Sequence, residues 1–114
     1  MRVGIAHQWR QFFRDWDVLL MPTPAFEHDH SDINTRRLAI DGKQTAYSDQ
    51  ALWSGVATLT GLPATAMPIG CSQEGLPIGM QIVGPYLEDR TTIAFAALAE
   101  REFGGFCAPP AFAH

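Results

Sequence analysis

The stretch from Thr60 to Gly84, TGLPATAMPIGCSQEGLPIGMQIVG, constrains the fold of this chain more than any other. It contains two almost wholly apolar runs, Ala64 to Ile69 and Pro77 to Val83, each bounded by Gly or Pro. Continuous apolar runs of this length are typical of strands covered on both faces, although a short run does not by itself exclude helix. The polar, glycine-framed segment 70–75 between them predicts that the two strands are antiparallel neighbours.

Helices are expected on both sides of this strand pair. Apolar residues between Met1 and Trp16 recur at three- and four-residue steps, which places them on one helix face. A second helix is predicted between Ser48, whose hydroxyl can cap it, and Gly61, which suits the left-handed position past a helix end. A last helix is expected to open at Glu88 or at the residue after it, and to end before a Gly-Gly pair. The predicted apolar faces are Ile5, Ala6, Trp9, Phe12, Phe13 and Trp16; Leu52, Val56 and Leu59, with Ala51 and Gly55 beside them; and Phe95, Ala96, Ala99 and Phe103.

Two further elements are short. Val18 to Met21 is an apolar run stopped by a Pro-Thr-Pro sequence, which predicts a strand inside a sheet. Between Arg37 and Tyr47, the Asp41-Gly42 dipeptide predicts a small hairpin. The polar segment Ala25 to Thr35 has no periodicity and is predicted to be a surface loop.

Length and composition bound the functions open to this chain. With 46% hydrophobic and 18% charged residues among 114, it can form a packed core and is not a disordered chain. A net charge of −4 without a basic cluster argues against nucleic acid as a partner. No apolar run approaches ~18 residues, so we expect neither a signal peptide nor a membrane span, and the expected location is the cytoplasm.

The segment Glu27 to Asp32, EHDHSD, brings imidazoles and carboxylates close together. Both side-chain types donate lone pairs to zinc or a similar ion, so His28, Asp29 and His30 are weak candidates for a metal site. A site needs three or four converging ligands, however, and close spacing without a framework is a weak motif. The favoured interpretation of this segment is therefore solvated surface.

Other residue types that carry chemistry lack a supporting context. None of the serines stands in a Gly-x-Ser-x-Gly elbow, where a sharp turn would expose the hydroxyl. Cys71 has no adjacent base or cation to lower its pKa, and both cysteines are expected to be small buried or half-buried residues. No Gly-x-Gly-x-x-Gly or P-loop pattern appears, so no cofactor is expected. The serines and cysteines are Ser31, Ser48, Ser54 and Ser72, and Cys71 and Cys107.

Several runs resemble the C-terminal part of amidase signature enzymes. They are Leu59 to Ala64, the Met67-Pro68 step, and above all GLPIGMQIVGP at 75–85. The segment Phe13 to Thr23 resembles the strand that precedes them in that family, and the final helix after Glu88-Asp89 also fits. The resemblance covers nearly the whole chain. It implies a carboxamide hydrolase with a mixed sheet between helical layers, in which a lysine base activates a serine nucleophile through a second serine.

The chain departs from this pattern at the catalytic residues. It has no Ser-Ser pair and no Gly/Ser-rich stretch, and its only lysine, Lys43, directly follows the predicted hairpin turn. A protonated surface lysine cannot take a proton from serine, so no catalytic residue is carried over from the family. We expect residues 1–114 to form a single partial domain, a small mixed sheet with helices packed on it, as a fragment of the amidase α/β/α sandwich.

Three functional hypotheses follow. The first is an amidase-like C-terminal fragment that lacks the Ser-Ser-Lys machinery and is inactive alone. The second is a docking subunit or regulatory protein that completes an amidase-type sheet with a separate N-terminal amidase chain or with another copy of itself, because exposed edges and apolar faces require a partner. The third, the relic of a truncated gene, is not separated from the second by the sequence.

Overall fold

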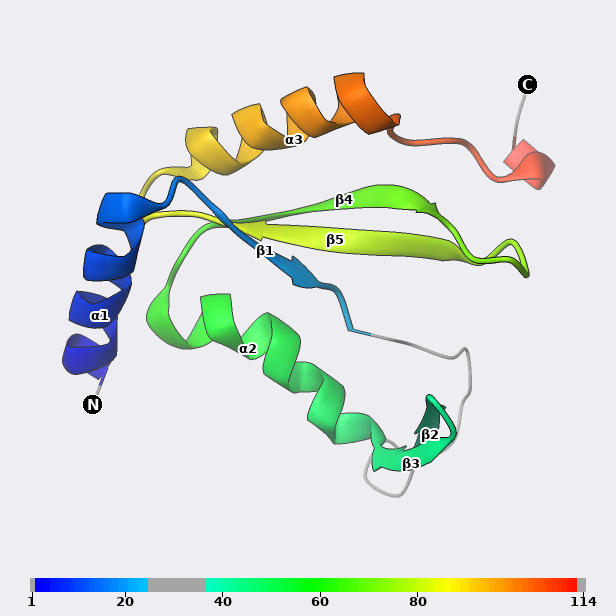
Figure 1. Cartoon of the computed structure of the whole chain (residues 1–114), viewed down its shortest axis with the longest axis horizontal. Helices are drawn as coiled ribbons and strands as arrows, with labels where there is room; N and C mark the ends of the chain where they lie inside the picture. The colour runs from blue at the N-terminus through cyan, green and yellow to red at the C-terminus, as the bar shows by residue number, and fades with distance from the viewer. Residues whose placement is uncertain (1, 25–36, 113–114) are drawn as a thin grey trace.

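The computed structural model describes residues 2–24 and 37–112, which form helices packed on a small sheet (Figure 1). In chain order the elements are α1 (Arg2–Asp15), β1 (Leu19–Pro22), β2 (Arg37–Ile40), β3 (Lys43–Ala46), the 3₁₀ helix η1 (Tyr47–Gln50), α2 (Ala51–Thr60), β4 (Ala64–Cys71), β5 (Pro77–Val83), α3 (Asp89–Phe103) and the 3₁₀ helix η2 (Pro110–Phe112). The predicted α/β class is confirmed.

The main sheet has three strands in the order β1-β5-β4, so its central strand is the last of the three in sequence. Leu19 pairs with Val83 on one side, and Ala64 pairs with the same Val83 on the other. Both pairings are antiparallel, which confirms the predicted β4–β5 neighbours. Parallel pairs of the expected mixed sheet are not found among the described residues. A bulge interrupts the β4 register between Pro68 and Gly70, where a proline that cannot donate to the ladder is tolerated.

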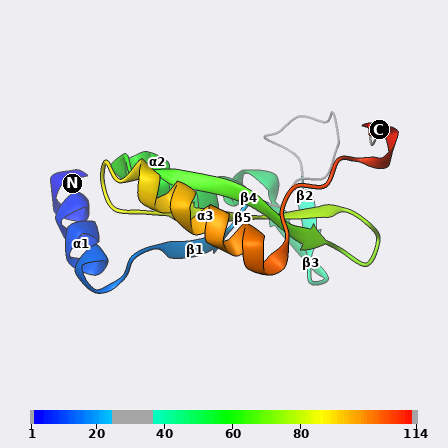
Figure 2. The ribbon, with the colours of Figure 1, turned by 90° about the horizontal axis from the view of Figure 1, so that it is seen from above.

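Alternate residues of β5 face opposite helical layers. Val83 is fully buried in a cluster with Ala57 of α2 and Leu62, against which Trp9 and Phe13 of α1 pack. The neighbouring Ile82 is fully buried in a second cluster on the other face; its members, with the partly buried residues around them, are Met67, Ala99, Val18, Met80, Phe95 and Ala96. The sheet thus lies between α1 and α2 on one side and α3 on the other, the layering expected of an α/β/α sandwich (Figures 1 and 2).

Side-chain hydrogen bonds tie these layers together. The amide Nε2 of the buried Gln81 in β5 donates to the carbonyl oxygen of Pro22 at 3.1 Å and to that of Trp53 at 2.7 Å. These bonds join the central strand to β1 and to α2. On the opposite face, the hydroxyls of Thr65 and Thr92 lie 2.8 Å apart and join β4 to α3.

The predicted hairpin between residues 37 and 47 is confirmed as a separate two-stranded sheet of β2 and β3. Asp41 and Gly42 both adopt positive φ, 51° and 77°, as a two-residue hairpin turn requires. Leu38 of β2 is buried. Both figures show this hairpin well separated from α1 (Figures 1 and 2).

The helix boundaries were predicted more accurately than the helix caps. Gly61 adopts the left-handed conformation at the end of α2, with φ of 68°, and α3 opens at Asp89, as expected. Ser48 does not cap a helix: it lies inside η1, and neither η1 nor α2 has a side-chain hydrogen bond at its N-cap. A 3₁₀ turn precedes α2, so the chain is already helical at the serine.

Burial was overestimated at several positions. In β4 only Met67 is buried, so the expectation of strands covered on both faces is wrong for that strand. Trp16, Leu52 and Phe103, predicted on inner helix faces, are exposed by 62%, 70% and 82%, and Leu59 is exposed as well. Both cysteines are exposed and free, rather than buried or half-buried. The described residues therefore leave most of each of these side chains uncovered.

Among the described residues, none of the helices has both the length and the apolar character needed to cross a bilayer.

Candidate functional site

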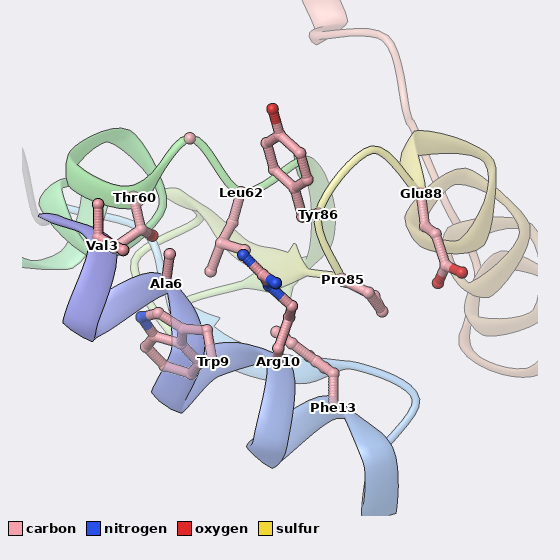
Figure 3. A pocket seen from close by; sticks show the side chains of 11 residues that line it. Val3, Ala6, Trp9, Arg10, Phe13, Thr60, Leu62, Pro85, Tyr86 and Glu88 are labelled. Carbon is pink, nitrogen blue, oxygen red and sulfur yellow. The ribbon is translucent and has the colours of Figure 1, made fainter.

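A hollow of the described surface, which we call the α1 groove, has a volume of about 670 Å³. It forms where three segments far apart in sequence meet: the inner side of α1, the end of α2, and the loop that leads from β5 to α3 (Figure 3). Its lining consists of Val3, Ala6, Trp9, Arg10, Phe13, Thr60, Gly61, Leu62, Pro85, Tyr86 and Glu88.

The apolar floor of the α1 groove follows from helical spacing and from one turn. Trp9 and Phe13 are one turn apart on α1, and their rings stack with centroids 5.9 Å apart and an interplanar angle of 27°. Gly61 reverses the chain after α2 in a conformation that favours glycine. Leu62 then donates its backbone N–H to the Ala57 carbonyl at 3.0 Å and lies buried beside the two aromatic rings.

Polar side chains stand at the edge of this floor. The Thr60 hydroxyl is engaged with the Val56 carbonyl of its own helix at 3.1 Å. Arg10 makes no ion pair or side-chain hydrogen bond with the residues that the structure describes. Figure 3 shows its guanidinium reaching toward Leu62, with the Glu88 carboxylate on the far side of Pro85.

A second hollow, the α3 groove, lies between α3 and the other face of the sheet, with a volume of about 490 Å³. Its walls are almost entirely apolar, with one carboxylate, that of Glu102. The lining residues are Leu20, Met67, Ile69, Met80, Phe95, Leu98, Ala99, Glu102, Phe103 and Gly104. Such a surface supplies packing area and offers no set of groups for bond-breaking chemistry.

The candidate metal ligands His28, Asp29 and His30 lie outside the described residues, as does Ser31. Within residues 2–24 and 37–112, no three His, Cys, Asp or Glu side chains are grouped so that they could hold a metal ion.

Two of the described serines are occupied by local structure. The Ser54 hydroxyl donates to the Ala51 carbonyl at 3.2 Å, and the Ser72 hydroxyl accepts the Leu76 N–H at 3.2 Å. Ser72 therefore stabilises the turn between β4 and β5. Lys43 is exposed at the start of β3, in the separate hairpin, and in the described part of the chain its ammonium has no serine partner.

Sequence reasoning missed the α1 groove. Its aromatic residues were assigned to core packing, which is correct for Trp9 and Phe13. The available signal was Arg10, a cation between two aromatic residues on the same helix. Arg10 meets residues 60–62 and 85–88 only in the folded chain. The spacing of residues along the sequence therefore does not predict this contact.

Comparisons with known proteins agree with this fold. The family model described as Amidase matches residues 1–93. The chain belongs to the amidase family.

Relatives within the amidase family are much longer than this chain. A glutamyl-tRNA(Gln) amidotransferase subunit of Rhodospirillum rubrum is 34% identical over 113 residues, which are 98% of this chain and 21% of that protein. Fatty-acid amide hydrolase 2-A of Danio rerio is 46% identical over 57 residues, which are 50% of this chain and 11% of that enzyme. The chain thus spans about a fifth or less of the relatives it matches.

A solved structure shows the same fold. It belongs to a study of a vestigial protein complex and the evolutionary origins of an s-triazine catabolic enzyme. The TM-score is 0.71 at 23% identity, and the match covers 91% of this chain and 22% of that one. The predicted resemblance to the amidase family is therefore confirmed by the family match, and the fold by this structure.

Proposed function

We propose that this chain is an amidase-fold segment that lacks the Ser-Ser-Lys machinery and is catalytically inactive by itself. The observation that carries the proposal is the position of Lys43: the only lysine of the sequence is exposed in the β2–β3 hairpin, apart from Ser54 and Ser72. Amide hydrolysis by this chemistry needs a nucleophilic hydroxyl in contact with an amine base, and Lys43 forms no such pair with either of these serines.

Hydrolysis assays with the purified chain test this proposal. Simple carboxamides and esters are incubated with the chain, with Ser54→Ala and Lys43→Ala variants, and with a full-length amidase as the positive control. We expect all three forms of this chain to remain at the uncatalysed background. Turnover that disappears in either variant would show that the chain carries its own catalytic site.

A second function is favoured by the surfaces of the fold. The outer edge of β4 has no strand partner among the described residues, and large apolar side chains are exposed along α2 and α3. Unpaired edges and contiguous apolar surface are the usual marks of an interface. We therefore propose, as the alternative, a cytoplasmic docking subunit or regulatory protein that completes an amidase-type sheet with a separate amidase chain or with another copy of itself.

Sedimentation velocity at micromolar concentration tests the docking function. The chain is examined alone and after co-expression with an amidase chain truncated before the matching segment. We expect either a dimer alone or a stable one-to-one complex. A strictly monomeric chain that also fails to bind the truncated amidase contradicts this alternative, and leaves the first proposal standing. Cell fractionation tests the cytoplasmic location, and recovery with membranes contradicts it.

A further inference from the structure

We propose that the α1 groove binds small monocarboxylic acids that carry an aromatic or branched apolar body. This site is distinct from the sheet edge and the α3 groove, and it does not depend on the docking function. Its size of about 670 Å³ is within the range of pockets that enclose small molecules.

The apolar floor of the α1 groove determines which apolar group the ligand carries. Trp9, Phe13 and Leu62 form a continuous apolar wall that is anchored in the Val83 cluster, so it is held in place without a ligand. An aromatic ring or branched chain on this wall removes apolar area from water on both sides of the contact. Tyr86 also lines the groove, and Figure 3 shows its ring extending away from α1.

Arg10 is the residue that would bind the carboxylate of the ligand. A guanidinium is always charged, and its planar fork of N–H donors matches a carboxylate in a two-bond geometry. Because Arg10 has no partner among the described residues, its donors are available in the groove. Arg10 is exposed at the edge of this wall, so a carboxylate can reach its guanidinium from solvent while the apolar body of the ligand packs on the wall.

Glu88 is the reason why the ligand is expected to carry only one carboxylate. It is the other charged residue of the lining, and Figure 3 places it beyond Pro85, on the far side from Arg10. A second carboxylate at that end of the ligand would approach a like charge. Monoacids are therefore preferred to diacids of the same length.

Titration calorimetry of the full chain with three matched probes tests this assignment. Phenylacetate carries the ring and the charge, phenylacetamide has the same shape without the charge, and 4-carboxyphenylacetate adds a second carboxylate at the opposite end of the ring. We expect phenylacetate to bind about tenfold more tightly than the amide, because an ionised hydrogen-bond pair is about twice as strong as a neutral one. 4-Carboxyphenylacetate is expected to bind more weakly than phenylacetate, because its second carboxylate approaches Glu88.

Two arginine variants localise the site. Arg10→Gln removes the guanidinium from the groove, whereas Arg14→Gln makes the same change one turn later on α1, outside the lining. We expect Arg10→Gln to abolish the preference for acid over amide, and Arg14→Gln to keep it, with both variants retaining the circular dichroism of the parent. Equal affinity for phenylacetate and phenylacetamide in the parent, no binding of either probe, or equal effects of the two substitutions would overturn the proposal.

Discussion

Gly84 is the residue at which the chain leaves the sheet for α3, and it has no room for a side chain. A Cβ placed there would lie 2.6 Å from Cγ2 of Thr92, a side chain that is itself almost wholly buried. The Gly84 N–H also donates to the Pro63 carbonyl at 3.0 Å, so the backbone is held on both sides. Glycine is required at position 84 because the Thr92 side chain lies too close to leave room for a Cβ, and not because the backbone has an unusual φ.

Replacing Gly84 by alanine is therefore expected to destabilise the fold. Overpacking of a buried contact that cannot relax costs about 1–3 kcal/mol. Urea unfolding monitored by circular dichroism measures the difference. Gly55→Ala is the matched control: a Cβ there meets nothing within 4 Å, and alanine in a helix is favoured by about 0.5–1 kcal/mol. A Gly84→Ala variant as stable as Gly55→Ala would show that the β5–α3 junction is loose.

At the scale of elements, α3 presents apolar side chains on more than one side. Leu98 lines the α3 groove and is 53% exposed, whereas Ile93 is 59% exposed and does not line it. The two residues are equal in size and similar in exposure, but only Leu98 lies in the α3 groove. They form a matched pair for locating the interface.

We expect Leu98→Glu to weaken association of the chain, with itself or with a truncated amidase, by at least about tenfold, because it places a charge in an apolar contact that excludes water. Ile93→Glu should leave the sedimentation profile unchanged. The opposite ranking, or equal effects of the two substitutions, would remove the α3 groove from the docking surface.

The elements themselves could be predicted from the sequence, and their burial could not. Gly61 and the Asp41-Gly42 turn depend on the backbone conformations that these residues themselves prefer. The predicted helix end and hairpin turn were therefore correct. Leu52 and Trp16 obey helical periodicity as well as Trp9 does, but only Trp9 meets a layer of the described residues. Periodicity says which side chains share a face; it does not say what lies opposite that face.

The candidate site was less predictable than the fold. The amidase runs identified the family because they are contiguous in sequence. The α1 groove joins residues from positions 3–13, 60–62 and 85–88, whose meeting depends on the β1-β5-β4 order. No spacing rule places Arg10 beside Leu62.

At the scale of the whole molecule, stability is concentrated in the central strand. Ile82 and Val83 have no exposed surface and are flanked by strands on both sides, whereas β2 and β3 have no strand partner but each other among the described residues. Local opening is easiest where few buried contacts hold an element. We expect the amides of Ile82 and Val83 to exchange most slowly with deuterium, and those of β2 and β3 at least about tenfold faster. Hairpin amides as protected as those of β5 would contradict this distribution.

The strand order also has a consequence for the newly made chain. Because both β1 and β4 pair with β5, the three-stranded sheet of the described residues is complete only after β5 has been translated. Leu19 therefore waits for a strand partner that lies far along the chain, and pairing between residues so distant in sequence is slow.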